Sequence, residues 1–192
     1  MIEPITNIKI YGLKDSVRKS KYPMSVDIET LNNDVTETVK KLAGSRKGEG
    51  HDNFLNGIIV QFDLTFSIKA WVEAERYHFF DFVSSQSTMH MISKMDIREQ
   101  CNEYVTESTI KHLEELKMNY LDEPNSKNYL KLLYNVPTGF NLTAGMTTNY
   151  RQLKTIYSQR KNHRLPEWRL FCQQLEKFPC SEFIIGGITD EN

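Results

Sequence analysis

The chain has 192 residues, of which 39% are hydrophobic and 26% are charged, and its formal net charge is -1. This length suits one domain with a core of its own, and this composition excludes a disordered chain. The near-neutral charge argues against a general nucleic-acid-binding protein, because phosphate binding requires a surplus of Lys and Arg.

Cysteine use and the N-terminal residues indicate the expected compartment. Cys101, Cys172 and Cys180 are far apart and form no Cys-x-x-Cys pair, so the sequence predicts neither a disulfide framework nor a zinc site. The N-terminus has no secretory signal pattern, and no apolar stretch has the length of a membrane span. We therefore expect a reduced, cytoplasmic setting with no metal and no membrane.

The first half of the chain predicts two strands and two short helices. Residues 5–11 alternate as a first strand, and a short helix begins near Leu13. Asp34 is expected to cap a second helix, because Glu37 three residues later completes a capping box. Residues 58–66 are the clearest strand, since apolar and polar side chains alternate along all of it.

The rest of the chain predicts a short helix, then longer helices and one more strand. The short helix is expected over residues 67–76, followed by a loop or irregular strand over 77–94. One long helix should run from 96 to 120, and a strand should occupy 142–149. A last helix starts near Pro166. Its apolar stripe comprises Trp168, Phe171, Cys172, Leu175 and Phe178.

The order of these elements indicates the fold class. Strands and helices succeed one another without an internal repeat, a low-complexity tract or a linker. The sequence therefore predicts an α+β fold with a mixed sheet and helices, forming a single domain over residues 1–192.

Three local features suit a phosphorylated ligand. The run Arg76-Tyr77-His78 ends the helix after the clearest strand, a hydroxyl-rich loop covers residues 84–88, and a basic stretch covers 151–164. Arg binds phosphate oxygens through two parallel hydrogen bonds, and Ser-rich turns add hydroxyl and N–H donors. Each feature also has a plainer interpretation: a cation at a helix C-terminus, an ordinary loop and a solvated helix face.

Several motifs occur in a characteristic order. His51 lies in a Gly-containing loop before the alternating strand, and a short helix then ends in Arg76-Tyr77-His78. Downstream, Asn149-Tyr-Arg151-Gln-Leu153 opens a helix that closes at Arg160. This order resembles the flavin-dependent thymidylate synthases, in which Arg-His-Arg occupies the first place and Asn-x-Arg-x-Leu the second. The resemblance spans nearly the whole chain.

The resemblance implies a nucleotide enzyme. Such an enzyme uses FAD to methylate C5 of dUMP, which gives dTMP, and takes carbon from methylenetetrahydrofolate and reducing power from NADPH. No enzyme cysteine needs to attack the pyrimidine. The resemblance also implies a homotetramer with active sites shared between subunits, working in the cytoplasm, or in a host cytoplasm if the chain is phage-encoded.

The resemblance also implies a role for individual residues. Arg160 would bind the uracil ring and stabilise charge that builds on it, as a catalytic group. Glu73, Gln86 and Ser87 would contact dUMP. The residues that would line the flavin are His51, Arg76, Tyr77, His78 and Asn149.

Differences from the family pattern leave two other interpretations open. Tyr77 and His78 stand where the family has the His and Arg that hold FAD phosphates, and Met89 replaces an Arg. One alternative is therefore a catalytically inactive nucleotide- or flavin-binding protein on the same fold, acting as a regulator or inhibitor. The other is a small nucleic-acid-binding protein that uses the basic stretch 151–164. The neutral overall charge argues against it, so we expect no stable nucleic-acid partner.

Overall fold

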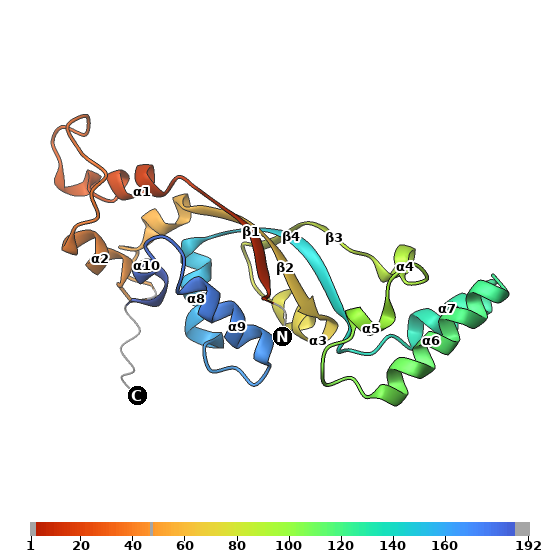
Figure 1. Cartoon of the computed structure of the whole chain (residues 1–192). Coiled ribbons are helices and arrows are strands. Elements are labelled where there is room, and N and C mark those ends of the chain that lie inside the picture. The colour runs from red at the N-terminus through yellow and green to blue at the C-terminus, as the bar shows by residue number, and fades with distance from the viewer. Residues whose placement is uncertain (1–2, 47, 187–192) are drawn as a thin grey trace.

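The computed structural model describes residues 3–46 and 48–186, and it confirms the α+β class (Figure 1). Within the described residues, four strands form one sheet: β1 (Ile5–Tyr11), β2 (Ile59–Ser67), β3 (Phe80–Ser85) and β4 (Asn141–Asn149). Their order in the sheet is β1-β2-β4-β3. The sheet is antiparallel in every described pair, not mixed, because β1 and β4 both run opposite to β2 and β3 runs opposite to β4.

The helices lie mainly on one face of the sheet and at its two ends. Their bounds are α1 Leu13–Lys19, η1 Tyr22–Met24, α2 Glu37–Ala43, η2 Asn53–Gly57, α3 Ile68–Ala74, α4 Thr88–Met91, α5 Ile97–Gln100, α6 Glu107–Asp122, α7 Ser126–Tyr134, α8 Tyr150–Arg160, α9 Pro166–Leu175 and α10 Glu182–Ile185. In the described part of the chain, no helix combines the length and apolar character needed to cross a bilayer.

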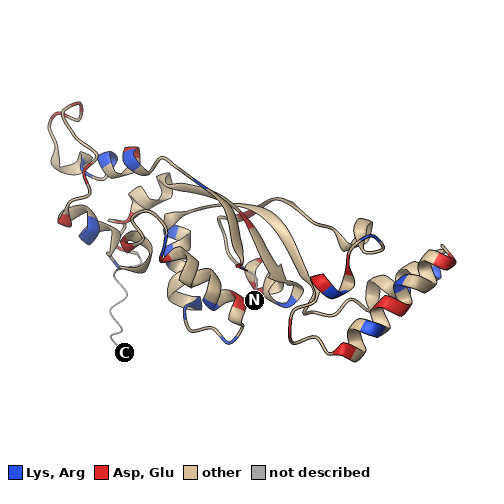
Figure 2. Ribbon diagram, in the orientation of Figure 1, with Lys and Arg blue, Asp and Glu red and all other residues tan. Residues whose placement is uncertain are grey.

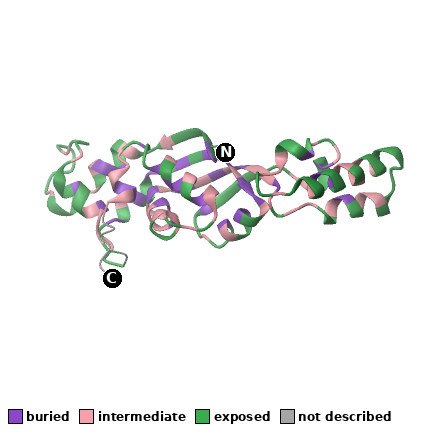
Figure 3. Ribbon diagram, turned by 60° about the horizontal axis from the view of Figure 1, so that its bottom comes forward, coloured by how far each residue is buried: buried purple, intermediate pink, exposed green. Residues whose placement is uncertain are grey.

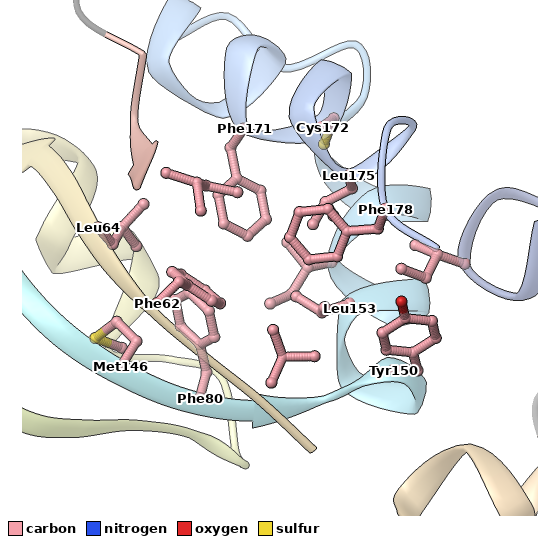
Figure 4. Close-up of a cluster of buried hydrophobic side chains, with 14 of the residues drawn as sticks. Phe62, Leu64, Phe80, Met146, Tyr150, Leu153, Phe171, Cys172, Leu175 and Phe178 are labelled. Carbon is pink, nitrogen blue, oxygen red and sulfur yellow. The ribbon is translucent and has the colours of Figure 1, made fainter. Parts of the chain in front are cut away.

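The main core lies between the sheet and helices α8 and α9. Phe62 and Phe80 point from the strands toward Phe171 of α9, with ring centroids 6.1 Å and 6.0 Å from that of Phe171 (Figure 4). The alternation predicted for β2 is confirmed, since Val60 and Phe62 are buried while Gln61 between them is exposed. Full burial of each large apolar side chain stabilises the fold by about 1.5–3 kcal/mol.

A second, smaller core holds together α5, α6 and α7. Its buried residues are Ile92, Ile97, Ile110, Leu113, Leu132 and Phe140. Helices α6 and α7 form a hairpin at one end of the elongated molecule, where most of their surface is exposed (Figure 3). Leu142 of β4 contacts both cores and so connects the hairpin to the sheet.

The single long helix expected from 96 to 120 is wrong. Asp96 does cap a helix, because its carboxylate accepts the N–H groups of Arg98 and Glu99, but that helix is α5 and ends at Gln100. Cys101 then pairs with Phe140 in an isolated bridge, which draws the backbone away from helical geometry. A new helix, α6, starts after Thr106, whose hydroxyl accepts the N–H of Thr109.

Two other boundaries also differ from expectation. Helix α2 begins at Glu37, and its cap is Thr36, which accepts the N–H of Val39, so Asp34 is not the cap. Residues 77–94 contain the edge strand β3 and the short helix α4, where an irregular segment was expected. The β3 pattern was hidden because its side chains after Phe80 are all exposed.

Candidate functional site

Arg160 is the centre of a polar cluster between α8 and α3. Its Nη1 atom donates to Oε2 of Glu73 at 2.8 Å, across 87 residues of sequence, and its Nε atom donates to the hydroxyl of Tyr77 at 2.7 Å. The Arg160 and Glu73 side chains are only 15% and 17% exposed. The guanidinium carbon also lies 5.0 Å from the ring centroid of Trp168 and 5.4 Å from that of Tyr77, which favours a cation.

Local sequence explains why these side chains meet. The Asn149 side chain accepts the N–H of Gln152 at 2.8 Å and so starts α8. Leu153 and Ile156 are buried on the inner face of this helix. Arg160 follows Ile156 by four residues, so it lies on the same face, one turn further on. In α3 the buried positions Ala70 and Ala74 flank Glu73, which is turned toward α8.

Glu73 supplies the negative charge of the cluster around Arg160. Its Oε1 atom accepts from Lys69 at 3.2 Å, and its Oε2 atom lies 3.1 Å from Nε2 of His163. Burial alone would raise the pKa of Glu73, but the hydrogen bond from Lys69 and the electrostatic interactions with His163 and Arg160 together outweigh it, so the net pKa is below its usual value. The carboxylate therefore stays ionised at neutral pH.

The other two titratable groups of the cluster stay neutral. Burial raises the pKa of Tyr77, against the opposing effect of its hydrogen bond from Arg160. Burial, followed by the nearby charge of Arg160, lowers the pKa of His163. Sequence reasoning did not single out His163 as a site residue, because a lone His within a basic stretch carries no motif; only its place three residues after Arg160 could have drawn attention to it.

A second polar cluster fastens α8 to the loop before β2. Asp52 is 3% exposed, and its Oδ2 atom lies 3.0 Å from Nζ of Lys154. Its Oδ1 atom lies 3.2 Å from Nε of Arg151. Lys154 also donates to the carbonyl oxygens of Ala43 and Ser45, at 2.6 Å and 2.8 Å. This cluster fixes the loop that carries His51.

The basic stretch 151–164 is therefore not simply a solvated helix face. Arg151, Lys154 and Arg160 each pair with a carboxylate that lies on another element. Elsewhere, Lys and Arg alternate with Asp and Glu along the ribbon (Figure 2). Of the three features expected to suit a phosphorylated ligand, this one has much of its charge neutralised inside the protein.

Four of the residues expected to line a flavin lie toward one end of the sheet: His51, Arg76, His78 and Asn149. Asn149 pairs with Ile59 at the start of β2, just after the loop that contains the exposed His51. The Thr148 hydroxyl donates to the carbonyl of Phe79 at 2.7 Å, which brings the loop of residues 76–78 to the same end. Arg76 and His78 are exposed in that loop, and Tyr77 turns inward to Arg160.

The predicted substrate residues Gln86 and Ser87 lie elsewhere. Gln86 donates its backbone N–H to Thr143 and accepts the Thr143 N–H on its side chain, both at 2.9 Å, so it prolongs the β3–β4 pairing. Ser87 is the residue that precedes α4. Thr143, which Gln86 contacts, is five residues along β4 from Thr148, which Phe79 contacts. Ser87 and Arg160 of the same chain therefore make no contact with each other in the described residues.

A hollow borders the Arg160 cluster. It has a volume of about 390 Å³, and its walls include Lys69 of α3 and Leu165, which follows His163. Thr106, Thr109 and Thr138 contribute hydroxyl groups to the same walls. Within residues 3–46 and 48–186, no group of His, Cys, Asp and Glu side chains is arranged to hold a metal ion.

The similarity of this chain to known proteins is found in its structure and not in its sequence. The sequence matches no known protein family and no curated protein. Two crystal structures of Helicobacter pylori ThyX, a flavin-dependent thymidylate synthase, both with FAD and dUMP, superpose on this chain with TM-scores of 0.73 and 0.70. Each is 17% identical, and each alignment covers 94% of this chain and 98% of ThyX. The chain has the ThyX fold.

A third solved structure also shares the fold. It is the UMP/dUMP methylase PolB from Streptomyces cacaoi, bound with 5-Br UMP, with a TM-score of 0.59 and 13% identity. The alignment covers 90% of this chain and 88% of PolB. Proteins with this fold thus include flavin-dependent thymidylate synthases and a UMP/dUMP methylase.

Proposed function

We propose that this chain is a flavin-dependent enzyme that methylates C5 of the uracil ring of dUMP. The observation that carries the proposal is the convergence of Arg160, Glu73 and Tyr77 from distant parts of the sequence. A fold likeness alone does not fix function, but these are the residues at which the family resemblance expects nucleotide and flavin contacts. The proposed domain spans residues 1–192.

Arg160 would bind the pyrimidine ring. Among the described residues, its hydrogen bonds to Tyr77 and Glu73 use Nε and Nη1, which leaves Nη2 for a ring carbonyl. A guanidinium held in this way stabilises negative charge on the ring as C5 reacts, and its low exposure strengthens the effect. Ser87, Gln86 and Glu73 would make the other contacts with dUMP.

The residues around the end of the sheet fit FAD in part. Arg76 offers a permanent cation, while His51 and His78 are exposed imidazoles, and together they could meet a pyrophosphate. Asn149 uses its side-chain oxygen to cap α8, so its amide N–H₂ remains for the flavin. The hydroxyl of Tyr77 accepts a hydrogen bond from Arg160, so only the ring of Tyr77 could contact the flavin. Bound FAD would supply the hydride, drawn from NADPH, that completes the methyl group.

The carbon would come from methylenetetrahydrofolate. Overall, C5 of dUMP would gain this carbon and lose its hydrogen as a proton, and dTMP and tetrahydrofolate would be released. The role left to this chain is to hold and orient the reactants and to stabilise charge on the pyrimidine. A reaction on free nucleotides suits the cytoplasm, or the cytoplasm of a host if a phage encodes the chain.

A homotetramer is part of the proposal. Ser87 and Gln86 lie toward the other end of β3 from the Phe79–Thr148 contact, so a second subunit would be needed to bring them to Arg160. Strand β3 is at the edge of the sheet and carries Phe82 and Val83, which are 45% and 65% exposed. Exposed apolar residues on an edge strand suit burial against another subunit. Light scattering during gel filtration tests the assembly.

The alternative function is a nucleotide- or flavin-binding regulator that has lost turnover. Glu73 neutralises Arg160 within the protein, and Tyr77 has no charge to offer to a phosphate. Both observations favour binding without catalysis.

An absorbance spectrum between about 300 and 550 nm, recorded with FAD and then with dUMP, tests the proposal. We expect a bound-flavin spectrum that shifts with dUMP, and release of tritium from C5-labelled dUMP when the other substrates are added. Flavin and dUMP binding without tritium release would support the alternative. A lack of flavin binding at saturating FAD would overturn the thymidylate synthase proposal.

A further inference from the structure

His163 lies in the turn that joins α8 to α9, and its side chain is 21% exposed. Its Nδ1 atom accepts the backbone N–H of Leu165 at 3.2 Å. Its Nε2 atom lies 3.1 Å from Oε2 of Glu73 and 2.7 Å from Nη1 of Arg160. The imidazole thus touches both partners of the central ion pair.

The contact with Leu165 determines which ring nitrogen carries the proton. A backbone N–H is always a donor, so Nδ1 must present a lone pair. In the neutral ring the proton is then on Nε2, and this N–H can donate only to an acceptor. Arg160 is a donor at every nitrogen, so in this tautomer the acceptor is Oε2 of Glu73, and the 2.7 Å approach of Nη1 to Nε2 joins two donors without a hydrogen bond. Oε2 therefore receives hydrogen bonds from both His163 and Arg160.

Each contact in this series fixes the orientation of the side chain that makes the next contact. Glu73 is held at Oε1 by Lys69 and at Oε2 by His163, so its carboxylate has one orientation. That carboxylate fixes Nη1 of Arg160, while Tyr77 fixes Nε. The Tyr77 hydroxyl is itself oriented, because it also donates to Gln159 at 2.9 Å. The guanidinium plane is set from both of its ends.

We infer that His163 is a positioning residue that, through Glu73, presents Arg160 to a neutral carbonyl oxygen of a heterocyclic ring and not to a phosphate. The inference rests on the proposed function and adds to it the residue that orients Arg160 and the reason why the site would reject a phosphate. A phosphate at Arg160 would face the Glu73 carboxylate, which already lies 2.8 Å from Nη1. A ring carbonyl has no net charge to be repelled, and a neighbouring ring N–H would be a donor to the carboxylate.

Two matched substitutions separate the hydrogen bond that His163 donates from the volume that its side chain fills. In His163→Gln the amide N–H₂ can still donate to Glu73, whereas His163→Leu keeps a similar volume without a donor. We expect His163→Leu to weaken the binding of deoxyuridine to the FAD-loaded protein about tenfold, the equivalent of one charge-assisted hydrogen bond. His163→Gln should remain within about threefold of the unmodified chain.

Glu73→Gln tests the discrimination against phosphate. Removing the negative charge should let inorganic phosphate compete with deoxyuridine at about tenfold lower concentration than in the unmodified chain. Ring ¹⁵N chemical shifts of His163 test the geometry without any ligand, and we expect a neutral ring protonated at Nε2.

The outcomes keep the two proposals apart. If the unmodified chain binds neither flavin nor deoxyuridine, the proposed function fails, and the ligand part of this inference fails with it. If it binds both, but His163→Leu binds deoxyuridine as well as His163→Gln does, the positioning role is overturned. An Nδ1-protonated ring would overturn the hydrogen-bond pattern, whatever the ligand results. Unchanged phosphate competition in Glu73→Gln would overturn the discrimination.

Discussion

Arg160 and Glu73 are 87 residues apart in the sequence, yet Nη1 of one lies 2.8 Å from Oε2 of the other. This contact joins the end of α8 to α3. Both side chains are mostly buried, so each charge depends on the other for its partner. The same pair is therefore a structural contact as well as the centre of the candidate site.

The first prediction concerns this structural role. Arg160→Ala should lower the free energy of unfolding by about 1.5–3 kcal/mol, because Glu73 loses a charge-assisted hydrogen bond and Tyr77 loses its donor. Urea denaturation followed by circular dichroism measures the change. Arg164→Ala is the control, since Arg164 is exposed and its carbonyl, not its side chain, is the group that accepts from Arg169. Equal stability of the two variants would contradict the role assigned to Arg160.

The second prediction concerns the buried carboxylate of Asp52. Asp52→Asn keeps the size of the side chain but leaves Lys154 and Arg151 without their counter-charge, and Lys154 is only 14% exposed. Loss of one partner from a buried pair costs on the order of 3 kcal/mol. Denaturation measures this, and hydrogen exchange should show faster opening in residues 48–57. Asp34→Asn, at an exposed position, should change neither; an effect as large there would contradict the prediction.

The third prediction concerns pH. In the folded chain the pKa of His163 is lowered from its ordinary 6.5, and the pKa of Glu73 is lowered from its ordinary 4.5. As the pH falls, the unfolded chain therefore takes up these protons at a higher pH than the folded chain does. This stability is present in full above pH 6.5 and is lost as pH falls through the two folded pKa values. The charges around His163 are Glu73, Arg160, Lys69 and Arg169.

His163→Gln removes the upper part of this dependence, because Gln does not titrate. Urea midpoints between about pH 7.5 and 5 should therefore fall less steeply in His163→Gln than in the unmodified chain. His112→Gln is the matched control, since His112 lies on the exposed hairpin with a side chain that is 60% exposed. A slope that His163→Gln leaves unchanged would show that the proton is bound elsewhere.

Much of the fold could be predicted from side-chain periodicity. Strand β2 and helix α9 were predicted because their apolar residues recur at the periods of a half-buried strand and a helix. Helix α6 was wrongly joined to α5, because the break at Cys101 depends on a bridge to Phe140, 39 residues away along the chain. Strand β3 was missed because an edge strand with an exposed face does not show alternation.

The candidate site could be predicted only in part, for a similar reason. Arg160, Glu73 and Tyr77 were expected at the site from a motif order, and the fold brings them together. His163 was not expected, since its role depends on the hydrogen bond from Leu165 and the distance to Glu73, which are tertiary facts. The pairing of Asp52 with α8 was hidden for the same reason, because Asp52 and Lys154 are 102 residues apart.

The last prediction concerns the turn between β1 and α1. Gly12 has φ of 73°, and a Cβ built there would lie 2.4 Å from the carbonyl oxygen of Gly57. Gly12→Ala therefore adds a backbone clash to the strain of a left-handed residue, which alone costs about 1–2 kcal/mol. Gly48 is the control, because its φ of 99° imposes strain while a Cβ there meets nothing within 4 Å. Gly12→Ala should lower the thermal midpoint clearly more than Gly48→Ala, and it should loosen η2, which begins at Asn53 and ends at Gly57. Because η2 follows His51 and Asp52 directly, the same substitution should also weaken FAD binding if His51 contacts the flavin. Equal midpoints for the two variants would show that α1 and η2 do not approach as closely as Gly12 requires.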